Sequence, residues 1–262
     1  MTKMPYLQIG ETHLFYQFYK REGIPLVFIH GWVGDHSKWE NQVNFFSNHY
    51  PVIVYDLEGH GKSDPAEDYS IKHHSITLHN FLQKLEVTKI YLVGHSMGGM
   101  VAQQFAVDFS DYIQKLVLIS TSSKIITSLR KRLAVLFMRF LLRISFKNFF
   151  RKLLSYTQSP QKSPEELTAM INCASSIQPH IIRKTFAKMT SFNSSKNISQ
   201  FENPTLILVG AKDPIISELM VRDLQKKVPN SSLKTITVGY HELMVDNADE
   251  INRYILEFIE SR

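Results

Sequence analysis

Residues 94–99 read Gly-His-Ser-Met-Gly-Gly and carry the clearest chemical signal in the chain. They follow an apolar run at 90–93 and precede a segment with helical apolar spacing, which places Ser96 on a tight strand-to-helix turn. Gly94 and Gly98 suit such a turn because a Cβ at either position would collide across it. We expect Ser96 to be a nucleophile, with N–H groups at the helix start directed at a developing oxyanion.

Two later positions supply an acid and a base for Ser96. Asp213 follows the apolar run at 205–209, and a carboxylate at the carboxyl end of a strand can reach a site there. His241 lies in a loop after the run at 233–238, from which it can reach the serine. The pattern predicts that His241 takes the Ser96 proton while Asp213 orients the imidazole. Asp246 is the less favoured acid, because it flanks the last predicted helix.

Residues 30–32, His-Gly-Trp, come directly after the first apolar run. A glycine at this point lets the backbone turn sharply as the strand ends. We expect the N–H groups of Trp32 and Met97 to form an oxyanion hole for a tetrahedral intermediate. The alternative is a plain strand-ending turn, which would be preferred if the Ser96 segment were absent.

Other reactive side chains are expected to have supporting roles. The charged, glycine-rich loop at 56–64 is interpreted as structural support, since a phosphate loop would need a different glycine-lysine spacing. His95 is expected to pack behind the site, and the single cysteine, Cys173, to be structural. A metal site at His73 and His74 is a weak alternative, so no metal is predicted. Four histidines have no acid partner at a convincing spacing: His60, His73, His74 and His79.

The elements that must position these residues alternate along the chain. Near-continuous apolar runs indicate strands covered on both faces, as in a parallel sheet; they lie at 25–30, 52–55, 90–93, 116–119 and 205–209. Helical patterns separate them, at 39–46, 71–85, 97–107, 217–228 and 248–259. The alternation predicts a doubly wound α/β fold, with an earlier strand at 14–18 pairing antiparallel near the edge.

The alternation breaks between 121 and 201, where the periodicity is helical and no strand is indicated. We predict a core made of residues 1–120 and 202–262, with a helical insertion at 121–201 over the strand ends. One predicted face of its first helix carries Leu133, Phe137 and Phe140, and we expect these residues to bind an apolar acyl chain.

Charge is concentrated in the same insertion. The chain of 262 residues has a net charge of +6, yet no Asp or Glu lies between Tyr112 and Pro164. Eleven Lys and Arg residues lie there, which leaves 19 basic against 24 acidic residues elsewhere. This asymmetry suggests an acidic partner or an anionic membrane surface, and no nucleic-acid partner is predicted. The alternative is a basic face that only contacts solvent.

The ends and the cysteine content bear on localisation. The first residues show neither the apolar run nor the cleavage site of a signal peptide, and no run reaches the length of a membrane span. A single cysteine excludes a disulfide within the chain, which fits a reducing compartment. We therefore expect a soluble cytoplasmic protein.

The segments at 30–32, 56–63 and 94–99, together with Asp213 and His241, resemble those of the α/β-hydrolase superfamily across nearly the whole chain. The resemblance implies a mostly parallel central sheet flanked by helices, with the insertion as a helical cap. Serine at position 96 argues against the subgroups of this superfamily that use Asp there, the dehalogenases and epoxide hydrolases. Among capped members, the chain is similar to small carboxylesterases, including pimeloyl-carrier-protein methyl ester esterases. The resemblance to those esterases implies a cap whose basic residues face an acidic acyl carrier protein, and the basic insertion here is compatible with such a partner.

The function implied is hydrolysis of a carboxylic ester or thioester through an acyl-enzyme, with no cofactor. The same three residues could also serve a lyase or a hydrolase of C–C bonds, and that alternative stays open. A ligand-binding protein without catalysis is the least favoured alternative, because the acid, base, nucleophile and oxyanion elements all have candidates.

Overall fold

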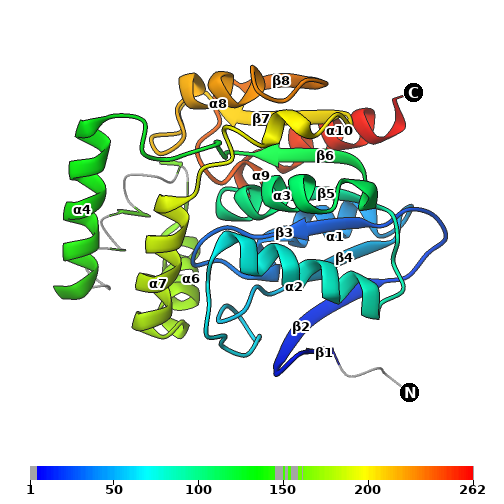
Figure 1. The fold of residues 1–262 in the computed structure, drawn as a ribbon, viewed down its shortest axis with the longest axis horizontal. Helices are drawn as coiled ribbons and strands as arrows, with labels where there is room; N and C mark the ends of the chain where they lie inside the picture. The colour runs from blue at the N-terminus through cyan, green and yellow to red at the C-terminus, as the bar shows by residue number, and fades with distance from the viewer. Residues whose placement is uncertain (1–4, 145–149, 151–152, 155–158, 161, 262) are drawn as a thin grey trace.

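The computed structural model describes residues 5–144, 150, 153–154, 159–160 and 162–261. One eight-stranded sheet runs through it in the order β1-β2-β4-β3-β5-β6-β7-β8 (Figure 1). β1 and β2 pair antiparallel, and β2 pairs antiparallel with β4. All other neighbours are parallel. The strands are β1 (Tyr6–Ile9), β2 (Thr12–Tyr19), β3 (Leu26–Ile29), β4 (Val52–Tyr55), β5 (Ile90–His95), β6 (Ile113–Ile119), β7 (Thr205–Gly210) and β8 (Ser231–Ile236).

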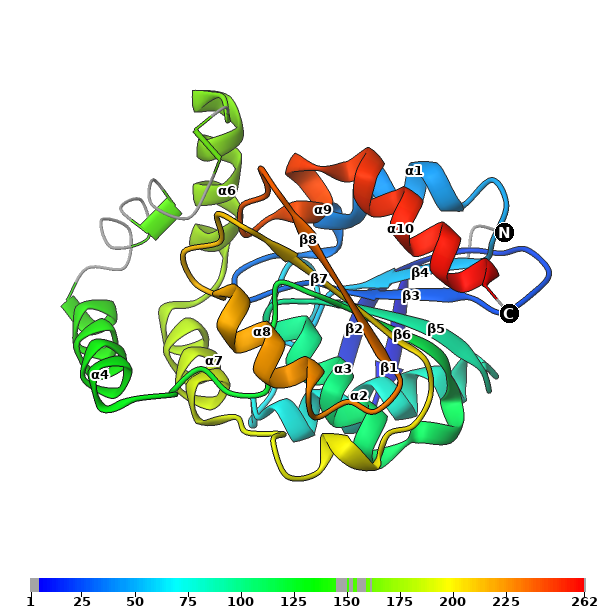
Figure 2. The same ribbon diagram turned by 90° about the horizontal axis from the view of Figure 1, so that it is seen from above.

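Helices cover both faces of the sheet (Figure 2). Residues of β3 divide between two apolar clusters, because alternate side chains on a strand point to opposite faces. Val27 and Ile29 pack with the helices of one face, whereas Leu26 and Phe28 pack with those of the other. The first face carries α2 (Ile71–Lys84), α3 (Met97–Asp108) and α8 (Glu218–Gln225); the second carries α1 (Glu40–Phe46), α9 (Leu243–Asp246) and α10 (Ala248–Glu260).

The predicted α/β class is confirmed, and each predicted strand has its counterpart within a few residues. β1 has no counterpart among the predictions, because its short run has only one buried residue. In the sheet, β4 lies on one side of β3 and β5 lies on the other, so the strand order switches direction at β3. Ligands of open α/β sheets bind at the carboxyl ends of strands beside such a switch.

In the described part of the chain, the α-helices α4 (Leu129–Ile144), α6 (Pro164–Ser176) and α7 (Pro179–Ser191) lie between β6 and β7 in sequence. They lie beyond the strand ends at one side of the molecule (Figure 1). α6 begins at a capping box, in which the Ser163 side chain accepts from the Glu166 N–H and the Glu166 side chain accepts from the Ser163 N–H. Within the described part of the chain, no helix has the length and apolarity that crossing a membrane requires.

Candidate active site

Ser96 is the one residue between β5 and α3, and its backbone conformation is one that few residues other than glycine adopt. Its φ is 51° and its ψ is −114°. The Ser96 N–H donates to the Ile119 carbonyl at 2.9 Å, and the Thr121 hydroxyl donates to the Ser96 carbonyl at 2.8 Å. Contacts from β6 and the residues after it therefore hold the strained turn on both sides.

Close backbone approach at the turn requires Gly98. A Cβ on this residue would lie 2.3 Å from the Ile29 carbonyl oxygen and 2.4 Å from that of His30. The first turn of α3 therefore packs directly against the end of β3. The side chain of Ser96 is brought to the edge of the sheet where β3 and β5 both end.

Asp213, His241 and Ser96 form a continuous chain of hydrogen-bonded side chains. His241 Nε2 lies 3.1 Å from Ser96 Oγ, and His241 Nδ1 lies 2.8 Å from Asp213 Oδ2. The N–H groups of Ile215 and Ile216 donate to Asp213 Oδ1 at 2.8 and 2.9 Å. Because the carboxylate accepts at Oδ2, the His241 proton lies on Nδ1, and Nε2 is left to accept from the serine hydroxyl.

The charged forms of Asp213 and His241 stabilise each other. Burial acts to raise the pKa of Asp213, but His241 and the two backbone N–H groups outweigh it and lower that pKa below its ordinary value. Burial acts to lower the pKa of His241, but Asp213 outweighs burial and raises it above 6.5. Asp213 is therefore ionised at neutral pH and stabilises the imidazolium that forms when His241 takes a proton.

The loop that carries Asp213 and the loop that carries His241 contact each other through their backbones. A Cβ on Gly210 would lie 2.3 Å from the Gly239 carbonyl oxygen, and the Lys212 N–H donates to that same oxygen at 2.9 Å. The loop after β7 and the loop after β8 therefore pack against each other without intervening side chains. This contact sets the distance between Asp213 and His241.

The residues predicted for the oxyanion hole border Ser96. Met97 is the first residue of α3, directly after Ser96. A Cβ on Gly31 would lie 3.3 Å from Ser96 Cβ, so the segment leading to Trp32 passes against the serine. The Trp32 ring reaches α7, where its Nε1 donates to Thr185 Oγ1 at 3.0 Å. Donation to the oxyanion by the two backbone N–H groups stays a prediction.

Sequence reasoning did not identify Lys38 and Glu242, a largely buried ion pair at 3.0 Å that lines the pocket beside His241. Burial acts to raise the pKa of Glu242, but Lys38 outweighs it and lowers the pKa to about 2. The two residues are 204 positions apart. The only sequence signal was that Glu242 adjoins His241. Behind them the His95 ring donates to the His241 carbonyl at 2.9 Å, and burial lowers the pKa of His95 to about 4.

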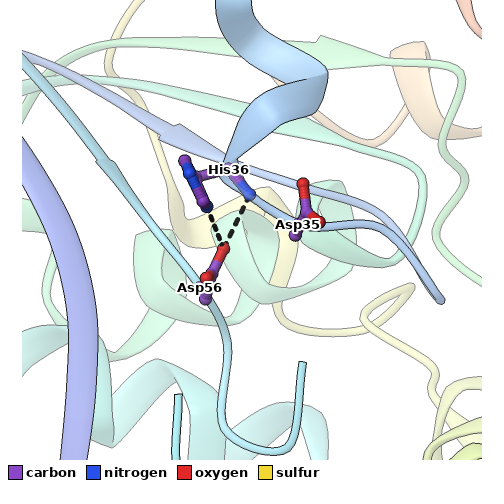
Figure 3. Close-up of side chains that lie close together, drawn as sticks. All are labelled: Asp35, His36 and Asp56. Atoms are coloured by element: carbon purple, nitrogen blue, oxygen red, sulfur yellow. Dashed lines mark hydrogen bonds and ion pairs between the residues drawn. The ribbon is translucent and has the colours of Figure 1, made fainter. Parts of the chain in front are cut away.

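The loop after β4 supports the site, as its glycines and charges suggested. Asp56 Oδ1 accepts from the backbone N–H of His36 at 2.7 Å and from its ring at 2.8 Å (Figure 3). Asp56 Oδ2 accepts from the Lys62 N–H at 2.8 Å. Asp56 thus ties its own loop to the segment that follows β3.

Asp35, His36 and Asp56 also place one potential metal-ligand atom each within 4.8 Å of one another. In Figure 3 His36 and Asp56 face each other, with Asp35 to one side. Asp35 Oδ1 accepts from the Ser37 N–H at 2.9 Å and caps the short helix that follows. Because protein donors already occupy these carboxylates, the contacts favour a structural cluster.

One expectation about the histidines is wrong. His73 and His74 do have an acid partner, because the buried Glu58 lies 3.1 Å from His73 Nε2 and 2.6 Å from His74 Nδ1. The two histidines lie on α2, whereas Glu58 lies in the loop before α2. Helical spacing in the sequence therefore does not reveal the contact. His60 donates to the Glu58 carbonyl at 3.1 Å, and His79 stacks on Phe109. This cluster does not line the pocket.

The two rival reactive groups have other partners. Asp246 pairs with Lys162 at 2.6 Å, and His241 contacts Asp213 instead. Burial raises the pKa of the Cys173 thiol, which donates to Asp35 at 3.2 Å. A thiol held neutral in this way is a poor nucleophile.

A pocket of about 340 Å³ opens above Ser96 and His241 between the core and the insertion. Its polar residues other than these two include Lys38, Glu242 and Lys131. The remaining wall is mostly apolar and comes largely from the insertion: Ala134, Val135, Met138, Phe150, Leu153, Leu154, Met170, Phe186 and Met189.

The prediction of which residues bind the acyl chain has to be corrected. Leu133, Phe137 and Phe140 do not line this pocket and are 60%, 61% and 56% exposed. α4 is apolar on two sides, and the side that contains Val135 packs inward. Periodicity identified the side with the larger residues, whereas packing against α7 and the core buries the other.

Known proteins share this architecture. A putative non-heme chloroperoxidase of Synechocystis sp. is 27% identical, over 98% of this chain and 100% of that protein. A pimeloyl-[acyl-carrier protein] methyl ester esterase of Vibrio cholerae is 22% identical, over 90% of this chain and 94% of that protein. The solved structure of an N-acyl homoserine lactone degrading enzyme has a TM-score of 0.87 at 25% identity, covering 97% of this chain and 100% of that chain.

A family model described as alpha/beta hydrolase fold matches residues 24–248. The match begins just before β3 and ends as α10 begins, so it includes Ser96, Asp213 and His241. The eight-stranded sheet and its order agree with that description. The resemblance inferred from the sequence is therefore confirmed, and the chain belongs to the α/β hydrolase fold family.

Proposed function

We propose that this α/β hydrolase cleaves carboxylic esters through an acyl-enzyme on Ser96. The observation that carries the proposal is the hydrogen-bonded chain from Asp213 through His241 to Ser96, ending in an apolar pocket. A serine hydroxyl needs a neighbouring base to become a nucleophile, and the base needs a group that orients it. His241 is the base and Asp213 is the group that orients it, and each contacts the next residue.

The reaction has two steps. Ser96 Oγ attacks the ester carbonyl while His241 Nε2 takes its proton, and the backbone N–H groups of Trp32 and Met97 donate to the oxyanion. The C–O bond to the alcohol then breaks, and the alcohol leaves with the proton from His241. Water, deprotonated by His241, attacks the acyl-enzyme and releases the acid and free Ser96.

The pocket supports an apolar acyl group. Methionine, leucine and phenylalanine side chains line the insertion side, and flexible methionines adapt to chains of different length. Among the similar proteins are an enzyme of methyl esters and an enzyme of acyl lactones, which are cyclic esters. Esters or thioesters with an aliphatic acyl chain are therefore the substrates to try first.

The test is a chain-length series of p-nitrophenyl esters, with an N-acyl homoserine lactone added, on the wild type and on Ser96→Ala. We expect turnover that rises with chain length to an optimum and falls by about 10⁴-fold or more in the variant. Far-UV circular dichroism checks that both proteins are folded. If folded wild type turned over no ester, the proposal would fail, and cleavage of C–C bonds or a lyase reaction would become the preferred function.

A further inference from the structure

The outward side of α4 exposes an unusual amount of apolar surface. Each of its large residues lies three or four positions from another member of the set, which places them along one side of the helix. This set, called here the outer face of α4, consists of Leu129, Leu133, Leu136, Phe137 and Phe140, each more than half exposed. Both views place α4 at the edge of the molecule, beyond α7 (Figures 1 and 2).

Cationic residues flank this face. Arg132, Arg139 and Arg143 follow at spacings of seven and four, so they form a row along the same helix. None of the three, nor Arg130, forms an ion pair with a described residue. The absence of any Asp or Glu between Tyr112 and Pro164 explains why α4 itself offers them no acid.

A second cavity, also of about 340 Å³, lies between α4 and α7. Four of its eight lining residues are Lys or Arg, a fifth is His180, and none is acidic. This cationic groove is formed by Arg139, Arg143, His180, Arg183 and Lys184, with Leu142, Phe186 and Ala187 completing the wall. Guanidinium groups bind phosphate through paired N–H donors, so the groove suits a phosphate group.

Charge and apolarity together select among the possible occupants of the outer face. A second copy of the chain in a symmetric contact would bring the arginine rows of both copies together, which like charges oppose. An acidic protein would neutralise the arginines but would still have to cover five large apolar side chains. A phospholipid layer presents phosphate groups and acyl chains side by side, which matches a helix with arginines beside leucines and phenylalanines.

We propose that the outer face of α4 docks on an anionic phospholipid surface, with lipid phosphate in the cationic groove, and that the ester substrate is taken from that surface. The part concerning substrate rests on the proposed ester hydrolysis. The inward side of the same helix lines the pocket through Ala134, Val135 and Met138. Docking would therefore bring lipid acyl chains to within about one helix diameter, roughly 10 Å, of the pocket wall.

The direct test is sedimentation with vesicles of phosphatidylglycerol or of phosphatidylcholine, using the wild type and Ser96→Ala. We expect both proteins to bind phosphatidylglycerol vesicles equally. Binding should weaken by about tenfold or more as salt rises from about 0.05 to about 0.5 M, because screening removes the charge attraction. Binding to phosphatidylcholine should be weaker at low salt.

The decisive variant is Phe137→Asp with Phe140→Asp. We expect its vesicle binding to fall by about tenfold or more, since two aromatic side chains no longer enter the lipid. Leu219→Asp on α8 is the matched control, because Leu219 is 80% exposed and lies outside α4. Turnover of soluble p-nitrophenyl acetate reports that each variant keeps its fold and site.

Specific results would overturn the docking surface. They are no binding to phosphatidylglycerol at low salt, or binding that the double variant leaves unchanged. Binding of inorganic phosphate or of an acidic carrier protein without vesicle binding would also reject a lipid surface. Vesicle binding without turnover of any ester would keep the docking surface and reject the proposed hydrolysis. Turnover of soluble esters without vesicle binding would do the reverse.

Discussion

The core side and the insertion side of the pocket are built from different kinds of contact. On the core side, backbone meets backbone: the turn at Ser96 packs against the end of β3, and Gly210 packs against Gly239. On the insertion side, apolar side chains from α4 and α7 close the pocket, and the Trp32 side chain donates a hydrogen bond from the core to Thr185 on α7.

The difference follows from what each side must do. Proton transfer requires the nucleophile, base and acid to be held within a fraction of an ångström, and packed backbone provides that rigidity. Binding an acyl chain requires apolar volume, which side chains of similar size supply almost interchangeably. Substitutions on the core side should therefore cost far more activity than equally buried substitutions on the insertion side.

The largest expected effect is on the core side. Asp213→Asn should lower kcat for a p-nitrophenyl ester by about 10⁴-fold, because an amide no longer holds the His241 proton on Nδ1. Asp246→Asn is the matched control, since Asp246 contacts Lys162 and not His241. We expect it to lose less than about tenfold. A greater loss from Asp246→Asn than from Asp213→Asn would reassign the acid.

Next in size is the buried ion pair beside the base. Lys38→Met should cost up to about 3–5 kcal/mol of unfolding free energy in urea, because the largely buried Glu242 carboxylate is left without its partner. Lys38→Met with Glu242→Leu should recover most of that loss, since no unpaired charge stays behind. Equal losses from the single and double variants would mean that packing, and not charge, explains the effect.

The same pair predicts how stability depends on pH. A carboxyl whose pKa is lower folded than unfolded adds stability that is complete above the unfolded pKa and is lost as pH falls through the folded one. For Glu242 this loss should extend from about pH 4.5 down to about pH 2. The Lys38→Met, Glu242→Leu variant should lack this component of the acid transition in urea titrations.

A smaller effect concerns the pH dependence of the reaction. His241 must be neutral to accept the Ser96 proton, and Asp213 raises the pKa of His241 above 6.5. The acid limb of kcat/KM should therefore lie above pH 6.5 and fall about tenfold per pH unit below it. In Asp213→Asn the limb should shift to lower pH, because burial alone lowers the pKa. An unchanged limb would assign it to another group.

The smallest effect is expected on the insertion side, and it tests the two sides of α4. Met138→Ala should change the preferred acyl chain length and alter kcat/KM for long esters by about three- to tenfold, because it enlarges the pocket. Leu133→Ala, on the outer face, should change turnover of soluble esters less than twofold. The reverse ranking would restore Leu133 as an acyl-binding residue.

The sequence alone was sufficient to locate what local backbone geometry determines. Each of the three residues is recognisable from a few residues around it: Ser96 between Gly94 and Gly98, Asp213 after one strand and His241 after another. The runs that form β3 to β7 are equally local, because a strand buried on both faces must be apolar throughout. These features predicted the α/β fold and brought the candidate nucleophile, base and acid into one hypothesis.

Only the tertiary structure decided what depends on distant partners. The Lys38–Glu242 pair and the contacts of Glu58 with His73 and His74 join residues that no local pattern connects. The tertiary structure also decided which side of α4 faces the core. Both sides of the helix are apolar, so periodicity cannot tell which of them is buried. The residue types of a tight turn can be recognised from residues close together in the chain, whereas burial and charge pairing depend on whatever the rest of the fold places alongside.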